Sequence, residues 1–290
     1  MGFSIKDIKY KNKPILTLTD QELAGPWVSF ELEGADIGTI PVLLKNIEPT
    51  PIYQLVNSRI GLAINRITLD FDLREYLKKQ IKYNKIDSSI TLPDEPLLVR
   101  KYTDIFLYPK IPFIITFFTY KNLSKLNLKD FSIYLIFDLD INGLEGFDND
   151  YSGYDPEHDI IYQYDKTGLH AGFSAISKST HYESNLTREF QIDYGQLDLS
   201  DTLYEGAGEI LSALQIVFKT LRPGQAFQTA LIISAGETKE EMIRNIVQGK
   251  QKAMKYLKQV NRSIETEQRN TQEAGFININ KQEAKDCTEK

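Results

Sequence analysis

The sequence predicts a mainly β protein, in which one large antiparallel β-sandwich is followed by a long C-terminal amphipathic helix. Apolar and polar residues alternate with a period of two over most of residues 1–236, as they do in strands that bury one face. Such segments recur every ~8–20 residues and are separated by turn residues, which is typical of antiparallel sandwiches. After Gly236 the apolar period becomes that of a helix, so we expect the sandwich to end there.

Several strands can be placed from this alternation. It is clear in WVSFELEG and GLAINRITLDFDL, in the first quarter of the chain. The most apolar segment is IPFIITFF, which lies between Pro109 and Lys121 and is expected to be a deeply buried strand. A turn at Pro223-Gly224 precedes the last strand. The other predicted strands are FSIYLIFDLD, DIIYQYD, GLHAGFSAI, EFQIDYG, ALQIVFKTL and QAFQTALIISAG.

One segment before the middle of the chain is open to two interpretations. Its sequence is LREYLKKQIKYNK, residues 73–85. The apolar residues are spaced three and four apart, which suits a short surface helix, but a long hairpin fits equally well. We interpret the polar, proline-bearing stretch at residues 84–96 as a loop within the same sandwich.

A long helix is predicted after the sandwich. Thr238 followed by Glu241 forms a capping box. The apolar stripe of the helix comprises Ile243, Ile246, Val247, Met254, Leu257, Val260 and Ile264. The expected organisation is a β-sandwich at residues 1–236, a helix at 237–268 and a flexible polar tail at 269–290. This helix packs along its own sandwich or, alternatively, binds a protein partner or a second copy of the chain through residues 239–268.

The composition argues against several classes of function. A formal net charge of −6 and a pI near 5.3 do not suit a nucleic-acid partner, which requires a basic face. The single cysteine, Cys287, excludes an internal disulfide and a cysteine-ligated zinc site. No signal-peptide pattern and no apolar stretch of about 18 residues is visible. We therefore expect a cytoplasmic protein without a membrane partner.

The stretch FDLDINGLEGFDND, residues 137–150, is the clearest functional signal in the sequence. It begins like a calcium loop, D-x-D-x-N-G, in which alternate oxygens converge on the cation where the glycine allows a bend. A helix–loop–helix calcium hand is excluded, because Asn149 occupies the position of the bidentate Glu and a strand precedes the loop. The candidate calcium ligands are Asp138, Asp140, Asn142, Asp148 and Asp150. The alternatives are a solvated turn and a pair of catalytic carboxylates.

A stretch rich in tyrosine and carboxylates follows at residues 150–165. Tyrosine rings can stack on sugar faces, and carboxylates can accept hydrogen bonds from sugar hydroxyls. The candidate carbohydrate-binding residues are Tyr151, Tyr154, Asp155, Glu157, Tyr162 and Tyr164. Alternatively these tyrosines are structural, since tyrosine is common on half-exposed sheets.

No catalytic motif is visible in the sequence. A nucleophile elbow, a phosphate-binding glycine loop and a zinc-protease signature are all missing, and the three histidines lack the matched spacing of a transition-metal site. An enzyme, if present, would use acids such as Asp155, Glu157 and Glu183 on the concave sheet.

Three features close the β part of the chain. They are the phrase Leu221-x-Pro223-Gly224 before the last strand, Ala235-Gly236 at its end, and a helix from Lys239. In this order they resemble the supersandwich domain that precedes the catalytic barrel in prokaryotic glucoamylase-like glycoside hydrolases. The segment FDLDINGLEGFD is also similar to part of DOMON-type carbohydrate- and haem-binding sandwiches. Because the catalytic acids of the glucoamylase-like family lie in a separate α/α barrel, the resemblance implies a non-catalytic domain and carries over no catalytic residue.

The sequence thus predicts a non-catalytic, carbohydrate-associated binding or scaffolding module that is stabilised by calcium. One alternative is a glycoside hydrolase or lyase that uses carboxylates on the concave sheet. Another is a protein-interaction platform that acts through its C-terminal helix.

Overall fold

The computed structural model describes part of the chain. The described residues are 7–10, 13–17, 27–32, 54–58, 61–72, 98–107, 113–139, 141, 146, 148–190 and 198–258. The chain divides into two compact units, Met1–Lys250 and Gln251–Lys290. All of the described strands lie in the first unit.

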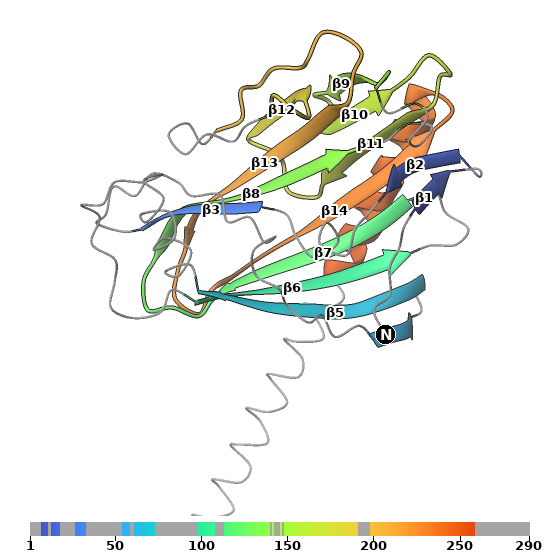
Figure 1. Ribbon diagram of the computed structural model, residues 1–290. Coiled ribbons are helices and arrows are strands. Elements are labelled where there is room, and N and C mark those ends of the chain that lie inside the picture. Colours follow the sequence, from blue (N-terminus) through green and yellow to red (C-terminus); the bar gives the residue numbers. More distant parts are fainter. Residues whose placement is uncertain are drawn as a thin grey trace, which may run out of the picture. The chain divides into compact units, whose positions relative to one another are not determined.

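The strands of the first unit form two large sheets and a small hairpin (Figure 1). Their bounds are β1 Asp7–Tyr10, β2 Lys13–Thr17, β3 Trp27–Leu32, β4 Gln54–Ser58, β5 Gly61–Asp72, β6 Leu98–Leu107, β7 Phe113–Asn122, β8 Leu128–Asp138, β9 Tyr151–Asp155, β10 Ile160–Tyr164, β11 His170–Ala175, β12 His181–Leu186, β13 Ile210–Leu221 and β14 Ala226–Gly236. One sheet has eight strands in the order β4-β5-β6-β7-β14-β11-β10-β9, the second has four in the order β12-β13-β8-β3, and β1 pairs with β2. Neighbouring strands are antiparallel.

The two large sheets face one another and share an aromatic core. The ring centroids of Phe137 in β8 and Phe173 in β11 are 4.9 Å apart, and those of Tyr120 in β7 and Phe131 in β8 are 5.4 Å apart. Gln163 of β10 is fully buried, and its Nε2 donates to the carbonyl oxygen of Ile210 in β13 at 2.6 Å. Ring packing and a buried amide therefore join the eight-stranded sheet to the four-stranded sheet, as in a β-sandwich.

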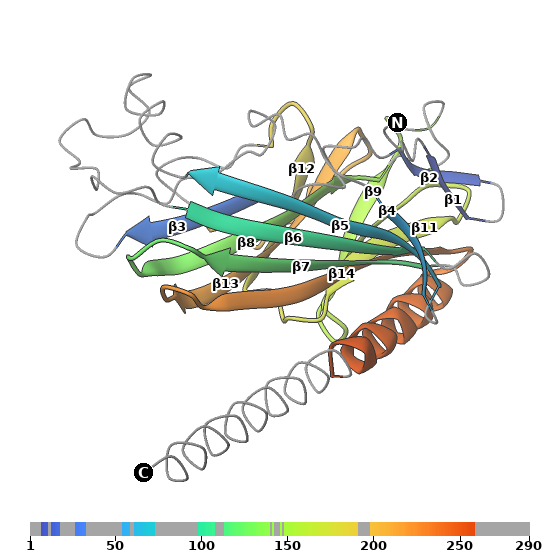
Figure 2. The ribbon, with the colours of Figure 1, turned by 90° about the horizontal axis from the view of Figure 1, so that it is seen from below.

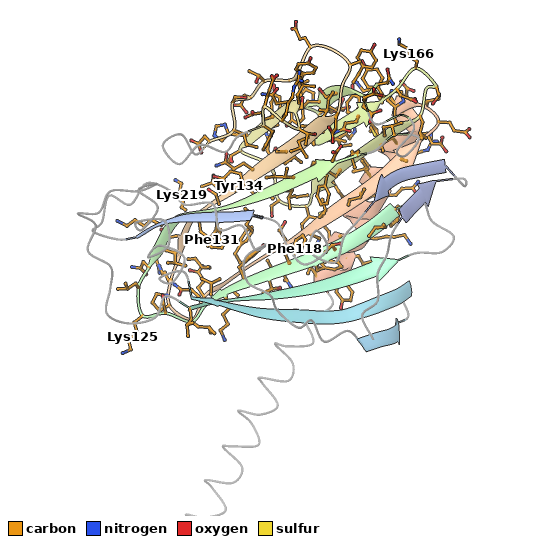
Figure 3. All side chains as sticks on the ribbon, viewed as in Figure 1. Phe118, Lys125, Phe131, Tyr134, Lys166 and Lys219 are labelled. Carbon is orange, nitrogen blue, oxygen red and sulfur yellow. The ribbon has the colours of Figure 1, made fainter. Side chains whose placement is uncertain are left out.

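Strands β7 and β8 are buried on both faces, which explains their long apolar runs. In β8, Phe131 points toward the other sheet, while Tyr134 lies on the opposite face and packs against Leu199 (Figure 3). In β7, Phe113 contacts the C-terminal helix near Gly249, whereas Tyr120 faces β8. The prediction that IPFIITFF is a deeply buried strand is confirmed for residues 113–118, and residues 111 and 112 lie outside the described residues.

The C-terminal helix is described over residues 239–258. It begins with the predicted capping box, in which the Glu241 backbone N–H donates to Thr238 Oγ1 at 3.2 Å. Up to residue 250 it packs on the face of β14 and β11 that points away from the four-stranded sheet (Figure 2). Met242 and Ile246 are fully buried there, and Asn245 Nδ2 donates to the carbonyl oxygen of Ala235 at 2.9 Å.

The predicted fold class is confirmed: the described chain is mainly β, with a curled antiparallel sheet, a second sheet and a C-terminal helix. The ambiguous segment at residues 73–85, most of EFQIDYG, the helix beyond residue 258 and the polar tail lie outside the described residues, so the predicted division at 236, 268 and 290 stays a prediction. No helical segment in the described ranges combines the length and the hydrophobicity needed to span a bilayer.

Candidate functional site

Two edge strands, β9 and β12, close one end of the sandwich. β9 is the outermost strand of the eight-stranded sheet, and β12 is the outermost strand of the four-stranded sheet. The hydroxyls of Ser152 and Ser184 share a hydrogen bond of 2.6 Å between them. The rings of Tyr154 and Tyr182 stack at 3.9 Å between centroids, with 13° between their planes. This arrangement fixes the ring of Tyr182 at the seam between the sheets.

Residues 198–208, named here the wall segment, run along this seam. The backbone N–H of Tyr204 donates to Ser184 Oγ at 3.0 Å, and Ser152 Oγ donates to the Tyr204 carbonyl oxygen at 3.4 Å. Thr202 forms a parallel bridge with Glu183 of β12. Both backbone polar groups of Tyr204 are thus held by serines, one from each sheet, so the position of this residue is fixed before any ligand arrives.

The seam and the wall segment enclose a groove of about 620 Å³, named here the tyrosine groove. Its lining includes Tyr151, Tyr164, Tyr182, Thr202, Tyr204 and Glu205. The four tyrosines come from β9, β10, β12 and the wall segment, so the fold gathers them from distant positions in the sequence. A volume of this size lies within the ~300–1,000 Å³ range of small-ligand sites.

An aromatic row leads from the groove toward the helix. The ring of Tyr164 stacks on Tyr151 at 5.5 Å and on His170 at 5.1 Å. Tyr162 lies 6.1 Å from Tyr164, and Lys239 Nζ sits 4.9 Å above the Tyr162 ring, where a hydrogen bond to Tyr162 raises the pKa of Lys239. At one end of the row Tyr162 is 7% exposed and packs inside the protein. At the other end Tyr151 and Tyr164 line the groove, where a ligand can reach them.

Close packing explains why a glycine stands in β9. A Cβ at Gly153 would lie 2.3 Å from Cζ of Tyr162, which is closer than side chains approach one another. Gly153 is the β9 residue paired with Tyr162 in the sheet. The glycine therefore allows the Tyr162 ring to lie across the edge strand.

A buried carboxylate positions Tyr154 beneath the groove. Asp159 is 6% exposed and has a left-handed backbone with φ of 56°. It accepts hydrogen bonds from the Tyr154 hydroxyl at 2.7 Å and from the Ser179 N–H at 2.8 Å, and also from the Ser179 hydroxyl. Burial, followed by the hydrogen bond to Asp159, raises the pKa of Tyr154 to about 12. Asp159 thus holds Tyr154, and Tyr154 in turn supports Tyr182.

The predicted acids do not converge on this groove. None of Asp155, Glu157 and Glu183 lines the groove, and on β12 strand alternation directs Glu183 to the face opposite Tyr182. Burial alone would raise the pKa of Asp155, but hydrogen bonds from His158 and the charge of its ring lower it. Glu183 Oε2 accepts the backbone N–H of Ser200 at 2.9 Å. Glu157 is exposed in the turn between β9 and β10.

The acidic loop is only partly described. Asp138 ends β8, Asp148 is exposed and Asp150 is 1% exposed. Asp150 Oδ2 accepts the Ile141 N–H at 3.2 Å, which draws the two ends of the loop together, whereas Asp140 and Asn142 lie outside the described residues. Among the described residues, no group of three His, Cys, Asp or Glu side chains forms a metal-binding cluster. Calcium binding therefore stays a prediction.

The structure adds three residues that sequence reasoning did not select: Tyr182, Tyr204 and Glu205. Tyr182 precedes Glu183, and Tyr204 and Glu205 open the glycine-bearing run YEGAGE, residues 204–209. The signal that could have identified them is a tyrosine next to a carboxylate in the sequence, as at residues 150–165. Of the predicted ligand residues, Tyr151 and Tyr164 line the groove; Tyr154 supports it, and Tyr162 packs in the aromatic row.

Comparison with known proteins yields similarity at the level of fold. No protein-family model and no curated protein sequence matches the chain. A bacterial glucoamylase complexed with acarbose superposes with a TM-score of 0.51 at 12% identity, covering 85% of this chain and 31% of that one. A polysaccharide lyase has a TM-score of 0.43 at 9% identity, covering 84% and 32%. A putative aldose 1-epimerase of Escherichia coli K12 has a TM-score of 0.41 at 7% identity, covering 80% and 92%.

The glucoamylase comparison carries the argument about fold. The similarity extends over most of this chain. The chain itself spans less than a third of the length of the glucoamylase. The resemblance noted in the closing strands is therefore supported as a likeness of architecture.

Proposed function

We propose that this β-sandwich is a non-catalytic carbohydrate-binding module whose ligand occupies the tyrosine groove. The observation that carries the proposal is the gathering of Tyr151, Tyr164, Tyr182 and Tyr204 around one groove of about 620 Å³. The Tyr164 ring stacks on Tyr151, and the Tyr182 ring stacks on Tyr154, so packing orders these rings at the groove before a ligand arrives.

The chemistry of the groove suits a sugar. Tyrosine faces are apolar and electron-rich, so they can cover the C–H face of a pyranose ring, while their hydroxyls remain available for hydrogen bonds. Glu205 and Thr202, which also line the groove, can accept from and donate to sugar hydroxyls. The similarity in fold to a glucoamylase that was solved with acarbose supports an association with carbohydrate, without identifying the binding site.

A non-catalytic role fits the placement of the carboxylates. Glycoside hydrolysis normally requires two carboxyl groups facing each other across the sugar bond, ~5–10 Å apart. Among the described residues that line the groove, Glu205 is the single carboxylate. Asp155 and Glu183 do not line the groove, and the lowered pKa of Asp155 makes this group a poor proton donor at neutral pH.

The proposal is tested by titrating the protein with a panel of soluble gluco-, manno- and xylo-oligosaccharides in a calorimeter. We expect binding that Tyr182→Ala weakens by about tenfold, or about 1.4 kcal/mol. Tyr182→Phe is the matched variant that keeps the ring, so it should bind nearly as well as the wild type. Lys125→Ala, at the β7–β8 turn (Figure 3), controls for general surface effects.

Two results would overturn the proposal. One is that the wild type binds none of the panel. The other is that Tyr182→Ala, folded by circular dichroism, binds as tightly as the wild type. A reducing-end assay on the same samples addresses the hydrolase or lyase alternative, since sustained release of new ends would assign catalysis to the chain.

The protein-interaction alternative rests on a single described side chain. Met254 of the predicted apolar stripe is 44% exposed, whereas Val260 and Ile264 lie outside the described residues. Light scattering of the wild type and Met254→Glu tests it. A larger particle for the wild type alone would favour association through the helix, and identical monomers would remove this alternative for self-association.

A further inference from the structure

A second hollow lies beside the tyrosine groove. This side hollow has a volume of about 250 Å³. Its lining includes Leu186, Arg188, Tyr204, Ala207, Gly208 and Glu209. Tyr204 lines both the groove and the side hollow. Because 250 Å³ is below the ~300 Å³ at which small-ligand sites begin, the side hollow is better suited to extend the groove than to act alone.

Tyr204 is a fixed partition between the two spaces. A Cβ at Gly206 would lie 3.1 Å from Cε1 of Tyr204, so the ring lies close over the backbone there. A Cβ at Gly208 would lie 2.4 Å from Cδ2 of Leu186, so Leu186 also packs directly on the wall segment. The backbone of Tyr204 is held by Ser152 and Ser184, so this residue borders both spaces from a fixed position, and one ligand that spans them can contact it in each.

The charges around the two spaces suit an uncharged ligand. The groove has Glu205, and the side hollow has Arg188 and Glu209. The Arg188 side chain is 80% exposed, and its Nε lies 3.5 Å from Glu189 Oε1, so a neighbouring carboxylate already offsets its charge. Neutral sugar hydroxyls can donate to these carboxylates and accept from the guanidinium. A uronate or sulfate group would instead meet carboxylates and a net charge of −6.

We propose that the tyrosine groove and the side hollow together bind an uncharged oligosaccharide, with one sugar unit in the groove and the next beyond Tyr204 in the side hollow. This inference rests on the proposed function and names its ligand class and its length requirement. The protein therefore selects chains over monosaccharides, because a single sugar reaches only the groove, while a chain also gains contacts in the side hollow.

The test measures how affinity depends on the length of the oligosaccharide, in the wild type and in variants of the side hollow. Calorimetric titrations use uncharged oligosaccharides of one to six units from the best-binding series, with a uronate oligosaccharide of equal length. Wild type, Arg188→Ala and Ala207→Leu are measured; the first variant removes a donor and the second fills the hollow. Arg222→Ala, an exposed arginine in the β13–β14 turn, is the matched control, and thermal unfolding confirms that every variant is folded.

We expect wild-type affinity to rise by about tenfold between the single sugar and the longer chains, the value of about one good hydrogen-bonded contact. Both side-hollow variants should remove that gain and leave single-sugar binding unchanged, while Arg222→Ala behaves as wild type. Two results would overturn the proposal that the side hollow binds a second sugar: an affinity that does not depend on oligosaccharide length, or a rise in affinity with length that both variants retain. Neither result would contradict binding in the groove. Tighter binding of the uronate would overturn the ligand class. Absence of all binding would instead remove the proposed function itself.

Discussion

The two ends of the sandwich use polar side chains in opposite ways. At the β7–β8 turn, Asn122 is fully buried, and its side-chain amide nitrogen and oxygen both form hydrogen bonds within the protein. Its Nδ2 donates to the carbonyl oxygens of Leu126 at 2.7 Å and Leu221 at 2.8 Å. Its Oδ1 accepts from the N–H of Ser124 at 2.9 Å and from the hydroxyl at 2.6 Å.

At the β9–β12 end, the hydrogen bonds are made by small serines, and large rings are left beside a hollow. Ser152 and Ser184 tie the sheets together and hold Tyr204. The rings of Tyr182 and Tyr204 line the groove. A fully satisfied polar network stabilises the fold, whereas rings positioned by such a network and facing open space are suited to bind. The contrast separates stabilising residues from candidate binding residues.

The largest expected effect is on stability at the Asn122 end. Asn122→Leu leaves the carbonyl oxygens of Leu126 and Leu221 without their amide donor, and we expect the free energy of unfolding to fall by about 3–5 kcal/mol. Urea unfolding measures it. Asn149→Leu, at an exposed asparagine, is the matched control and should cost less than about 0.5 kcal/mol. Similar losses in both variants would contradict the distinction between the two ends.

A smaller loss of stability is expected from Gly153→Ala at the other end. The new methyl group would overlap the Tyr162 ring, so the free energy of unfolding should fall by about 1–3 kcal/mol. Gly206→Ala is the milder companion, since its Cβ would lie 3.1 Å from Tyr204, and it should cost less. Thermal unfolding of both variants gives the order, and an equal or reversed order would show that Tyr162 is free to move aside.

Tyr154→Phe tests how the groove is supported. The variant loses the hydrogen bond to Asp159 and should be about 1 kcal/mol less stable at neutral pH. The folded-state pKa of Tyr154, about 12, lies above its ordinary value of 10.0. Its contribution is therefore fully present below pH 10 and is lost as pH rises through 12.

The gap in stability between wild type and Tyr154→Phe should accordingly narrow over that alkaline range. Urea unfolding at a series of pH values measures it. A gap that stays constant would mean that the phenol keeps an ordinary pKa, and that Asp159 does not hold it.

The smallest expected effect concerns calcium at the acidic loop. If Asp138, Asp140, Asn142, Asp148 and Asp150 bind the ion, added calcium should raise the midpoint of thermal unfolding by a few degrees relative to a chelator. Asp140→Ala should abolish the shift. Equal midpoints with calcium and with chelator would leave the loop as an acidic turn closed by Asp150 and the Ile141 N–H.

Sequence reasoning captured what is local. The turn at Pro223-Gly224, the capping box at Thr238 and the buried runs of β7 and β8 follow from nearest neighbours along the chain. It did not identify β9 or β12 as strands, because YSGYD and HYESNL are too polar for an apolar alternation to show. β9 takes its strand character from β10, whose paired residues lie 5 to 13 positions away. β12 takes it from β13, whose paired residues lie 24 to 34 positions away, a distance that a local pattern does not contain.

The same limit explains the partial success at the site. Tyr151 and Tyr164 were selected from composition alone, and both line the groove. Tyr182 and Tyr204 join them only because β9 and β12 belong to different sheets that meet at one end. The insertion of β14 between β7 and β11, on which the helix packs, is a long-range pairing of the same kind.

The wall segment also affects how readily two molecules can associate through their sheet edges at high concentration. Outermost strands normally present unpaired backbone groups on which another molecule can add a strand. Here Thr202 pairs beside β12, and Asp150, just before β9, is bridged to Gly208. An incoming strand would have to peel away the wall segment first. This end of the molecule is thereby guarded against intermolecular sheet growth by the same segment that shapes its groove.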